Sequence, residues 1–208
     1  MIYIIITTCI NNKIGNNTNI NSRNNRYVEC ISQLLTLIEN DNDIKPIIVE
    51  NCGLRNTYLN NFNCDVLYTN NNSLYFIHKG FNELLDMKEV INKYNINDDD
   101  IIIKLTGRYK LLNNDFINLV KNNNKDAYVK FFNVCTKEFI HYNSVLGLFA
   151  IKCKYLKKFN YNGLNNISPE VEFAEFVRAN IEKNNIIEID NLNLEYCLYL
   201  DENNLLIV

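Results

Sequence analysis

The chain begins with a continuous run of apolar residues, and similar runs recur between segments of helical periodicity. Ile2–Ile6 is rich in β-branched residues, which is typical of a strand buried on both faces. Apolar residues recur every three or four positions from Arg26 to Ile38 and from Phe81 to Ile91, and this spacing predicts two helices. Further short apolar runs lie at 47–49, 66–68 and 101–105. Strands and helices that alternate in this way predict βαβ units and a parallel sheet.

The pattern is less regular in the second half of the chain. It predicts a helix near 115–121, a strand near 128–132 and an apolar segment at 145–151, so we expect the sheet to become mixed there. A clearer helix begins at Ser168, because serine is a good N-cap and the following proline suits the first helical position. The tail from Ile186 to Val208 alternates enough to supply two short strands.

Length and composition agree with one folded domain. The 208 residues have a mass of 24.4 kDa, with 47% hydrophobic and 22% charged residues, which indicates a folded soluble protein. We therefore predict a single Rossmann-like α/β domain over residues 1–208, with a mixed, mostly parallel sheet flanked by helices. No apolar run approaches the roughly 20 residues of a membrane span, and no signal-peptide pattern opens the chain. We expect a cytoplasmic location.

Charge and cysteine content narrow the classes of function. The net charge of −3 argues against a nucleic-acid partner and against a helix that binds a membrane surface. Seven cysteines without metal-ligand spacing indicate reduced, packed thiols. Asparagine accounts for 41 of the 208 residues and fills the predicted loops, so glycine, proline, arginine and histidine are more informative.

The position of a polar residue relative to the predicted strands indicates whether it could belong to a ligand site. In open α/β sheets, ligands bind beyond the carboxyl ends of the strands. This rule favours Thr7 and Thr8, Glu50 and Asn51, and the segment 104–109. The acidic run at 98–100 precedes its strand, so we interpret it as a solvated turn rather than a metal site.

The segment that contains Lys104, Thr106, Gly107 and Arg108 is the strongest local signal. A glycine at a strand end lets the main chain approach an anion, and the Arg108 guanidinium can grip two phosphate oxygens. The alternative is a turn glycine beside a surface ion pair.

A second group of cations lies near predicted helix starts. Lys79 and Gly80 combine a positive charge with exposed N–H groups, an arrangement that favours phosphate. A lysine at this position is more often a solvated residue at a helix start. Arg23 and Arg26 begin the first predicted helix, and the sequence does not decide whether they face solvent or ligand.

Three carboxylates occupy the start of the helix that follows Ser168. Glu170, Glu172 and Glu175 could simply complement the helix dipole and its free N–H groups. The alternative is a general base that removes a proton from an attacking hydroxyl. The sequence leaves the three open, and we take Glu172 as the candidate base.

The order of these pieces resembles the nucleotide-sugar-binding glycosyltransferase fold known as GT-A, and most of all the small glycosyltransferase domains of large DNA viruses. The resemblance spans nearly the whole chain, and its later part includes the strand at Gly147–Ile151. It implies that Thr7, Thr8 and Glu50 line a nucleoside pocket. It also implies transfer of a sugar from a nucleoside diphosphate, most simply UDP, to a hydroxyl of a glycan or another acceptor.

One departure from that fold concerns the metal. Its central strand usually ends in Asp-x-Asp, which holds Mn²⁺ or Mg²⁺, whereas this chain has Thr106-Gly107-Arg108. Either Arg108 and Lys79 neutralise the departing diphosphate, or another acidic residue supplies a metal site. A nucleotidyltransferase would need a glycine-rich loop, but the segment from Cys9 to Gly15 contains one glycine. A degenerate domain that acts as a binding or assembly module is the remaining alternative.

Overall fold

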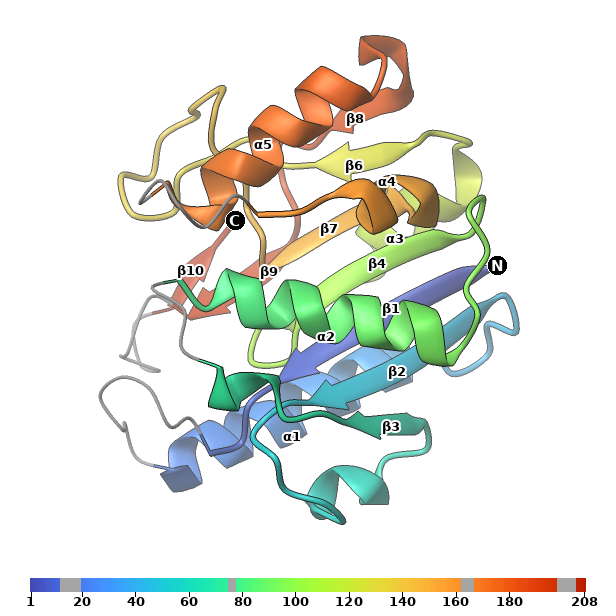
Figure 1. The fold of residues 1–208 in the computed structure, drawn as a ribbon, viewed down its shortest axis with the longest axis vertical. Helices are drawn as coiled ribbons and strands as arrows, with labels where there is room; N and C mark the ends of the chain where they lie inside the picture. Colours follow the sequence, from blue (N-terminus) through green and yellow to red (C-terminus); the bar gives the residue numbers. More distant parts are fainter. Residues whose placement is uncertain (12–19, 75–77, 162–166, 198–204) are drawn as a thin grey trace.

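The computed structural model describes residues 1–11, 20–74, 78–161, 167–197 and 205–208. Its centre is a seven-stranded sheet with the order β3-β2-β1-β4-β7-β6-β8 (Figure 1). These strands are β1 (Ile2–Thr8), β2 (Ile44–Glu50), β3 (Asp65–Tyr68), β4 (Ile101–Thr106), β6 (Ala127–Val129), β7 (Leu148–Lys152) and β8 (Ile186–Glu188). A smaller antiparallel sheet has the order β10-β9-β5, built from β5 (Lys110–Leu111), β9 (Leu194–Cys197) and β10 (Leu205–Ile207).

The mixed, mostly parallel sheet confirms the predicted fold class. Strands β1 to β4 are mutually parallel, β7 runs antiparallel to both of its neighbours, and β6 and β8 are parallel to each other. The opening strand is buried on both faces, as its composition predicts. Ile4 and Ile6 belong to the core on one side and Ile5 to the core on the other, and all three are fully buried.

Helices cover both faces of the large sheet (Figure 1). One face packs against α1 (Ile20–Leu37) and α3 (Asp115–Asn122) through residues such as Tyr27 and Phe116. The other packs against α2 (Gly80–Lys93), α4 (Cys153–Lys158) and α5 (Pro169–Asn180). Three short 3₁₀ helices lie at Tyr58–Asn61, Asn71–Ser73 and Lys183–Asn185. None of the helices in the described ranges is both long and apolar enough to cross a membrane.

Several boundaries differ from the sequence prediction. Helix α1 begins at Ile20 rather than near Arg26, because its first turns carry polar residues that give no apolar periodicity. Helix α4 is missed because six residues are too few to show a helical repeat. The tail contributes three strands rather than two. The predicted start of α5 is confirmed: Ser168 is its N-cap and accepts a hydrogen bond from the main-chain N–H of Val171 at 3.4 Å.

Candidate active site

A cleft lies beyond the carboxyl end of β4. It consists of a cavity of about 490 Å³ and a smaller one of about 260 Å³. The two adjoin, because both are lined by His78, Tyr109, Glu170 and Tyr196. In the order β3-β2-β1-β4, the connections leave the sheet in opposite directions between β1 and β4. This is the switch point at which α/β sheets bind their ligands.

The pairing of strands brings several predicted residues to this edge. Thr7 on β1 lies opposite Thr106 on β4, and Thr8 lies opposite Glu50 on β2. Gly107 continues the contact, since its N–H donates to the carbonyl of Thr7 at 2.9 Å. The predicted positions therefore converge, although the register alone does not direct their side chains at the cleft.

Arg108 places a positive charge in the larger cavity. Among the residues that the structure describes, its guanidinium makes no hydrogen bond and no ion pair, and its Nε is buried without a partner. The guanidinium carbon lies 5.9 Å from the ring centre of Tyr109. Burial opposes the charged form, but Tyr27 and Tyr109 lead the neighbours that together raise the pKa of Arg108. Arg108 as a whole is half-buried. A partly desolvated cation without a counter-ion costs free energy, and a ligand that supplies the anion would lower that cost.

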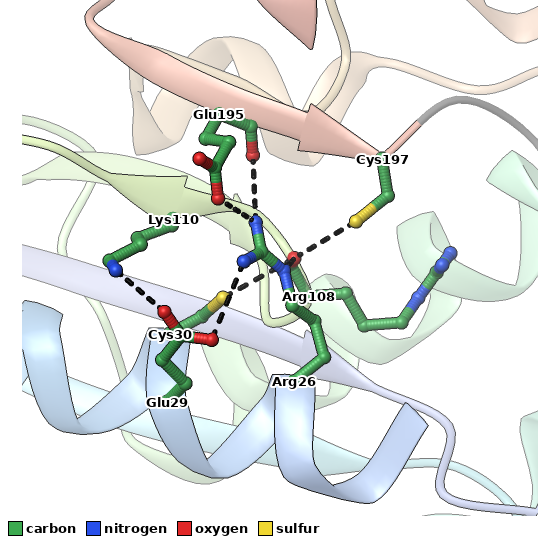
Figure 2. Close-up of polar contacts among 7 residues, drawn as sticks. All are labelled: Arg26, Glu29, Cys30, Arg108, Lys110, Glu195 and Cys197. Carbon is green, nitrogen blue, oxygen red and sulfur yellow. Dashed lines mark hydrogen bonds and ion pairs between the residues drawn. The ribbon is translucent and has the colours of Figure 1, made fainter. Parts of the chain in front are cut away.

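The main chain of Arg108 is held firmly. Its carbonyl accepts hydrogen bonds from Arg26 Nε at 3.0 Å, Cys30 Sγ at 3.4 Å and Cys197 Sγ at 3.6 Å (Figure 2). Arg26 also forms an ion pair with Glu195 at 2.6 Å. Its guanidinium is thus engaged inside the protein, and Arg26 lines neither part of the cleft.

Two further cations lie near Arg108. Lys79 lines the smaller cavity, and partial desolvation together with the positive charges of Arg23 and Arg108 lowers its pKa. Arg23 donates to the carbonyl of Cys9 at 2.9 Å and to the hydroxyl of Tyr27 at 3.1 Å. A multivalent anion bound beside Lys79 and Arg108 would relieve the repulsion between their positive charges.

Lys104 is present in the cleft, but its charge is already compensated. The side chain is fully buried, and Nζ forms an ion pair with Glu83 on α2 at 2.5 Å. Nζ also donates to Thr106 Oγ1 at 2.5 Å and to the carbonyl of Leu146 at 2.7 Å. Three acceptors saturate an ammonium group. Lys104 therefore links α2 to the central strand rather than offering an open charge.

Thr8 and Glu50 belong to an internal network. Thr8 Oγ1 donates to Glu50 Oε2 at 2.6 Å, and the same carboxylate accepts from the N–H groups of Ile10 at 3.2 Å and Cys52 at 3.0 Å. Glu50 is fully buried and fixes the main chain that follows β1 and β2. By contrast, the buried hydroxyl of Thr7 has no partner in the described part of the chain.

Asn51 joins a second buried network at the same edge of the sheet, on the face that α2 covers. Its Nδ2 donates to Asp86 Oδ2 at 2.7 Å, and Thr69 and Asn71 donate to the other oxygen at 2.8 and 2.7 Å. Asp86 lies on α2 and is fully buried, and this burial raises its pKa to about 7. The network anchors α2, whose first turn reaches the cleft, to the segments that follow β2 and β3.

The two glycines predicted at the site have packing roles. A Cβ on Gly107 would lie 2.9 Å from Thr8 Cγ2 and 3.1 Å from Tyr27 Cδ1, so glycine allows the turn to pack on β1 and α1. A Cβ on Gly80 would lie 2.7 Å from Pro169, so glycine brings the starts of α2 and α5 together. Since its N–H donates to Thr7, Gly107 does not present that group to an anion.

The structure separates the three candidate carboxylates. Glu170 lines both parts of the cleft, and the Ser144 hydroxyl donates to its main-chain carbonyl at 2.8 Å. Glu172 and Glu175 line a different pocket, beside Phe159 and Phe176. The geometry therefore brings Glu170, and not Glu172, into the same cleft as Arg108.

The residues at the end of β4 do not fit a divalent metal. The segment 106–108 supplies no carboxylate, and the cleft carboxylate Glu83 is paired with Lys104. Asp98 instead pairs with Lys157, and Asp100 with the terminal amine, at the opposite end of β4. Across the ranges that the structure describes, no group of three or more histidine, cysteine or acidic residues could hold a metal ion.

Sequence reasoning missed part of the cleft wall. Tyr109 and Tyr196 stack with ring centres 4.0 Å apart, and Gly147 makes room because a Cβ there would lie 2.5 Å from the Tyr109 ring. Asn133 and Asn143 line the larger cavity from the connection between β6 and β7. Tyr109 adjoins the Thr-Gly-Arg segment and could have been suspected, whereas the others are brought in by long-range pairing.

Comparison with known proteins identifies the fold. No family model matches the chain, and no curated protein sequence matches it. A crystal structure of a protein assigned as a nucleotide-diphospho-sugar transferase, from Desulfovibrio desulfuricans, matches 90% of this chain and 79% of its own, with a TM-score of 0.55 and 9% identity.

Two other solved structures have lower scores. A protein from STIV covers 99% of this chain and 89% of its own at 14% identity and a TM-score of 0.48. The galactosyltransferase LgtC, in complex with donor and acceptor sugar analogs, covers 89% and 72% at 9% identity and a TM-score of 0.47. This chain has the GT-A type of α/β fold.

Proposed function

We propose that the protein is a glycosyltransferase that moves a sugar from a nucleoside diphosphate, with UDP as the nucleotide, to a hydroxyl of a glycan. The single observation that carries the proposal is the guanidinium of Arg108. It is a cation in a cleft at the switch point of a GT-A-type sheet, with no anionic partner in the described residues. A diphosphate supplies the missing negative charge.

The cations supply the stabilisation that the reaction needs most. When the bond between the anomeric carbon and the diphosphate breaks, its electron pair passes to the departing diphosphate, which gains negative charge. Arg108 and Lys79, with Arg23 nearby, offer fixed positive charge at that point. Because the residues at the end of β4 do not fit Mn²⁺ or Mg²⁺, we propose that these side chains neutralise the diphosphate without a metal.

The larger cavity suits the acceptor. Beyond Arg108 it is lined by the amides of Asn133 and Asn143, the ring of Tyr196 and the carboxylate of Glu170. Aromatic and amide side chains are typical of sites that bind polar, ring-shaped ligands. We propose Glu170 as the general base in place of Glu172: its carboxylate takes the acceptor proton while the acceptor oxygen bonds to the anomeric carbon.

A turnover assay tests the proposal. Wild-type protein would be incubated with UDP-glucose, UDP-galactose and GDP-mannose in EDTA, with and without simple glycosides, and release of nucleoside diphosphate would be measured. We expect release from a UDP-sugar, reduced about 100-fold or more in Arg108→Met because the positive charge that faces the diphosphate is removed. Lys157→Met, which removes only an exposed ion pair with Asp98 at the opposite end of β4, is the matched control. Binding without turnover would instead favour a binding module. The absence of both binding and turnover would contradict the proposal.

A further inference from the structure

We propose that Arg26 is a positioning residue that acts on the ligand only through Arg108, an inference that rests on the proposed function. The sequence favours Arg108 as a ligand of the anion and leaves open whether Arg26 faces solvent or ligand. The structure gives them different surroundings. Arg26 is almost enclosed, with 10% of its side chain exposed, and it contacts the main chain of Arg108 rather than the cleft.

The Arg26 guanidinium is used on three sides. Nε donates to the Arg108 carbonyl at 3.0 Å, one terminal nitrogen bonds Glu195 Oε1 at 2.6 Å, and the other lies 3.5 Å from Glu29 Oε2 (Figure 2). These contacts join α1 and β9 to the turn after β4. Only a planar fork of donors can serve three such directions at once. Lysine at this position would keep the charge and lose the geometry.

The charge of Arg26 is balanced within the protein. Lys110 pairs with Glu29 at 2.6 Å, Glu29 with Arg26, and Arg26 with Glu195, so positive and negative groups alternate along the cluster. Figure 2 shows the side chain of Arg108 extending away from this cluster. One arginine is therefore compensated by protein and the other is left for a ligand.

Two thiols complete the support of the same carbonyl. Cys30 and Cys197 donate to it at 3.4 and 3.6 Å, from α1 and β9. A thiol is a weak donor, so Arg26 provides the strong, directional contact of the three. Fixing the carbonyl restricts the main chain from which the Arg108 side chain enters the cavity. Pre-organisation of this kind raises affinity because less ordering remains to be done on binding.

A double-mutant cycle tests the inference. UDP, inorganic pyrophosphate and uridine would be titrated calorimetrically into wild type, Arg26→Lys, Arg108→Met and the double variant, all in EDTA. Thermal unfolding would establish that each variant is folded. Lys157→Met is the matched control, since it breaks an exposed ion pair with Asp98 at the opposite end of β4, away from the Arg26 cluster. If Arg26→Lys does not fold, Glu195→Gln is the second variant. It weakens the ion pair that orients the Arg26 guanidinium and leaves Arg26 in place.

We expect Arg26→Lys to weaken UDP and pyrophosphate binding about five- to ten-fold, the effect of one hydrogen bond of ordinary strength, and to leave uridine binding unchanged. Arg108→Met should weaken both about 30-fold or more. In the Arg108→Met background, Arg26→Lys should change affinity less than about two-fold, because Arg26 has nothing left to position.

The outcomes separate the inference from the proposed function. Additive losses would show that Arg26 contacts the ligand directly and would overturn the inference, as would unchanged affinity in Arg26→Lys. If wild type binds pyrophosphate but no nucleotide, the proposed function fails while the cycle with pyrophosphate still decides the inference. If wild type binds neither, there is no anion site at Arg108 and both fail.

Discussion

At the scale of single residues, counter-ions decide which charged groups are available. Arg26, Lys104 and Arg108 all lie within or beside one short stretch of the sheet edge, yet two of them are satisfied by carboxylates. Arg108 has no such partner in the described structure. Breaking an existing ion pair to bind a ligand costs free energy, whereas an unpaired, partly desolvated cation is stabilised when a ligand brings an anion to it. Availability for a ligand thus depends on neighbours that are distant in sequence.

The carboxylates of α5 give a prediction at this scale. Glu170→Gln keeps the shape of the side chain and removes its basicity, so we expect turnover to fall about 100-fold, within the range for a general base, with little change in UDP affinity. Glu172→Gln should retain nearly full turnover, because Glu172 lines another pocket. Steady-state rates with a UDP-sugar and a glycoside would check this. A large loss in Glu172→Gln alone would contradict the assignment.

The sequence identified some of these residues and not their roles. Arg108 stands out because arginine is scarce and the residue follows a strand. Thr8, Glu50 and Asn51 lie at the predicted edge, but their side chains form hydrogen bonds inside the protein. The partners are 35 to 42 positions away in the sequence. Such pairings are fixed by strand register and helix packing, which a local pattern does not contain.

At the scale of elements, the starts of α2 and α5 frame the cleft because they approach each other closely. In Gly80→Ala the new Cβ would meet Pro169 at 2.7 Å. We expect the overpacking, about 1–3 kcal/mol, to exceed the gain of about 1 kcal/mol from replacing glycine within a helix. Thermal unfolding should therefore show a lower midpoint, and UDP should bind more weakly because α2 carries Lys79 at its start.

A matched control for Gly80→Ala is available on the same helix. Asn92→Ala changes an exposed residue near the other end of α2 and should be neutral or slightly stabilising. If Gly80→Ala were as stable as Asn92→Ala, the close approach of α2 and α5 would not be required.

The buried Asp86 network gives a pH-dependent prediction for α2. Burial raises the pKa of Asp86 from the ordinary 3.8 to about 7. Between these values the folded protein holds a proton that the unfolded chain has lost. The contribution of Asp86 to the free energy of unfolding is thus largest near pH 4 and decreases as pH rises to about 7, by at most about 1.4 kcal/mol per pH unit.

Thermal unfolding from pH 4 to pH 8 would measure this contribution. Asp86→Asn cannot ionise, so its stability should fall less steeply with pH than that of wild type. Asp99→Asn, which changes an exposed carboxyl, should follow the wild-type profile. Equal slopes in wild type and Asp86→Asn would show that Asp86 is ionised throughout, held so by its three donors.

Elements were predictable where the apolar pattern is long. The apolar pattern predicts the strands that are buried on both faces and helices α2 and α5. Each helical turn, and each pair of strand residues, must place apolar side chains in the core. The polar first turns of α1, the short helix α4 and the third tail strand carry too few apolar residues to be recognised.

At the scale of the whole molecule, the strand order of the large sheet determines which of the candidate residues lie together. The strand order puts Thr7, Thr106 and Arg108 at one edge of the sheet. Glu170 and the larger cavity lie beside them, where the sheet changes from parallel to mixed. Arg108 and Lys79 line the cleft at the end of β4, where the segment 106–108 supplies no carboxylate. We therefore expect binding of a nucleoside diphosphate that does not require a divalent ion.

Calorimetric titration of UDP in EDTA, into wild type and into Arg108→Met, measures whether the Arg108 guanidinium holds the diphosphate without a metal. We expect saturable binding to wild type that changes little when Mn²⁺ replaces EDTA, and at least about 30-fold weaker binding to Arg108→Met. Binding that appears only with Mn²⁺, or that is equally strong without the guanidinium, would show that Arg108 does not have this role.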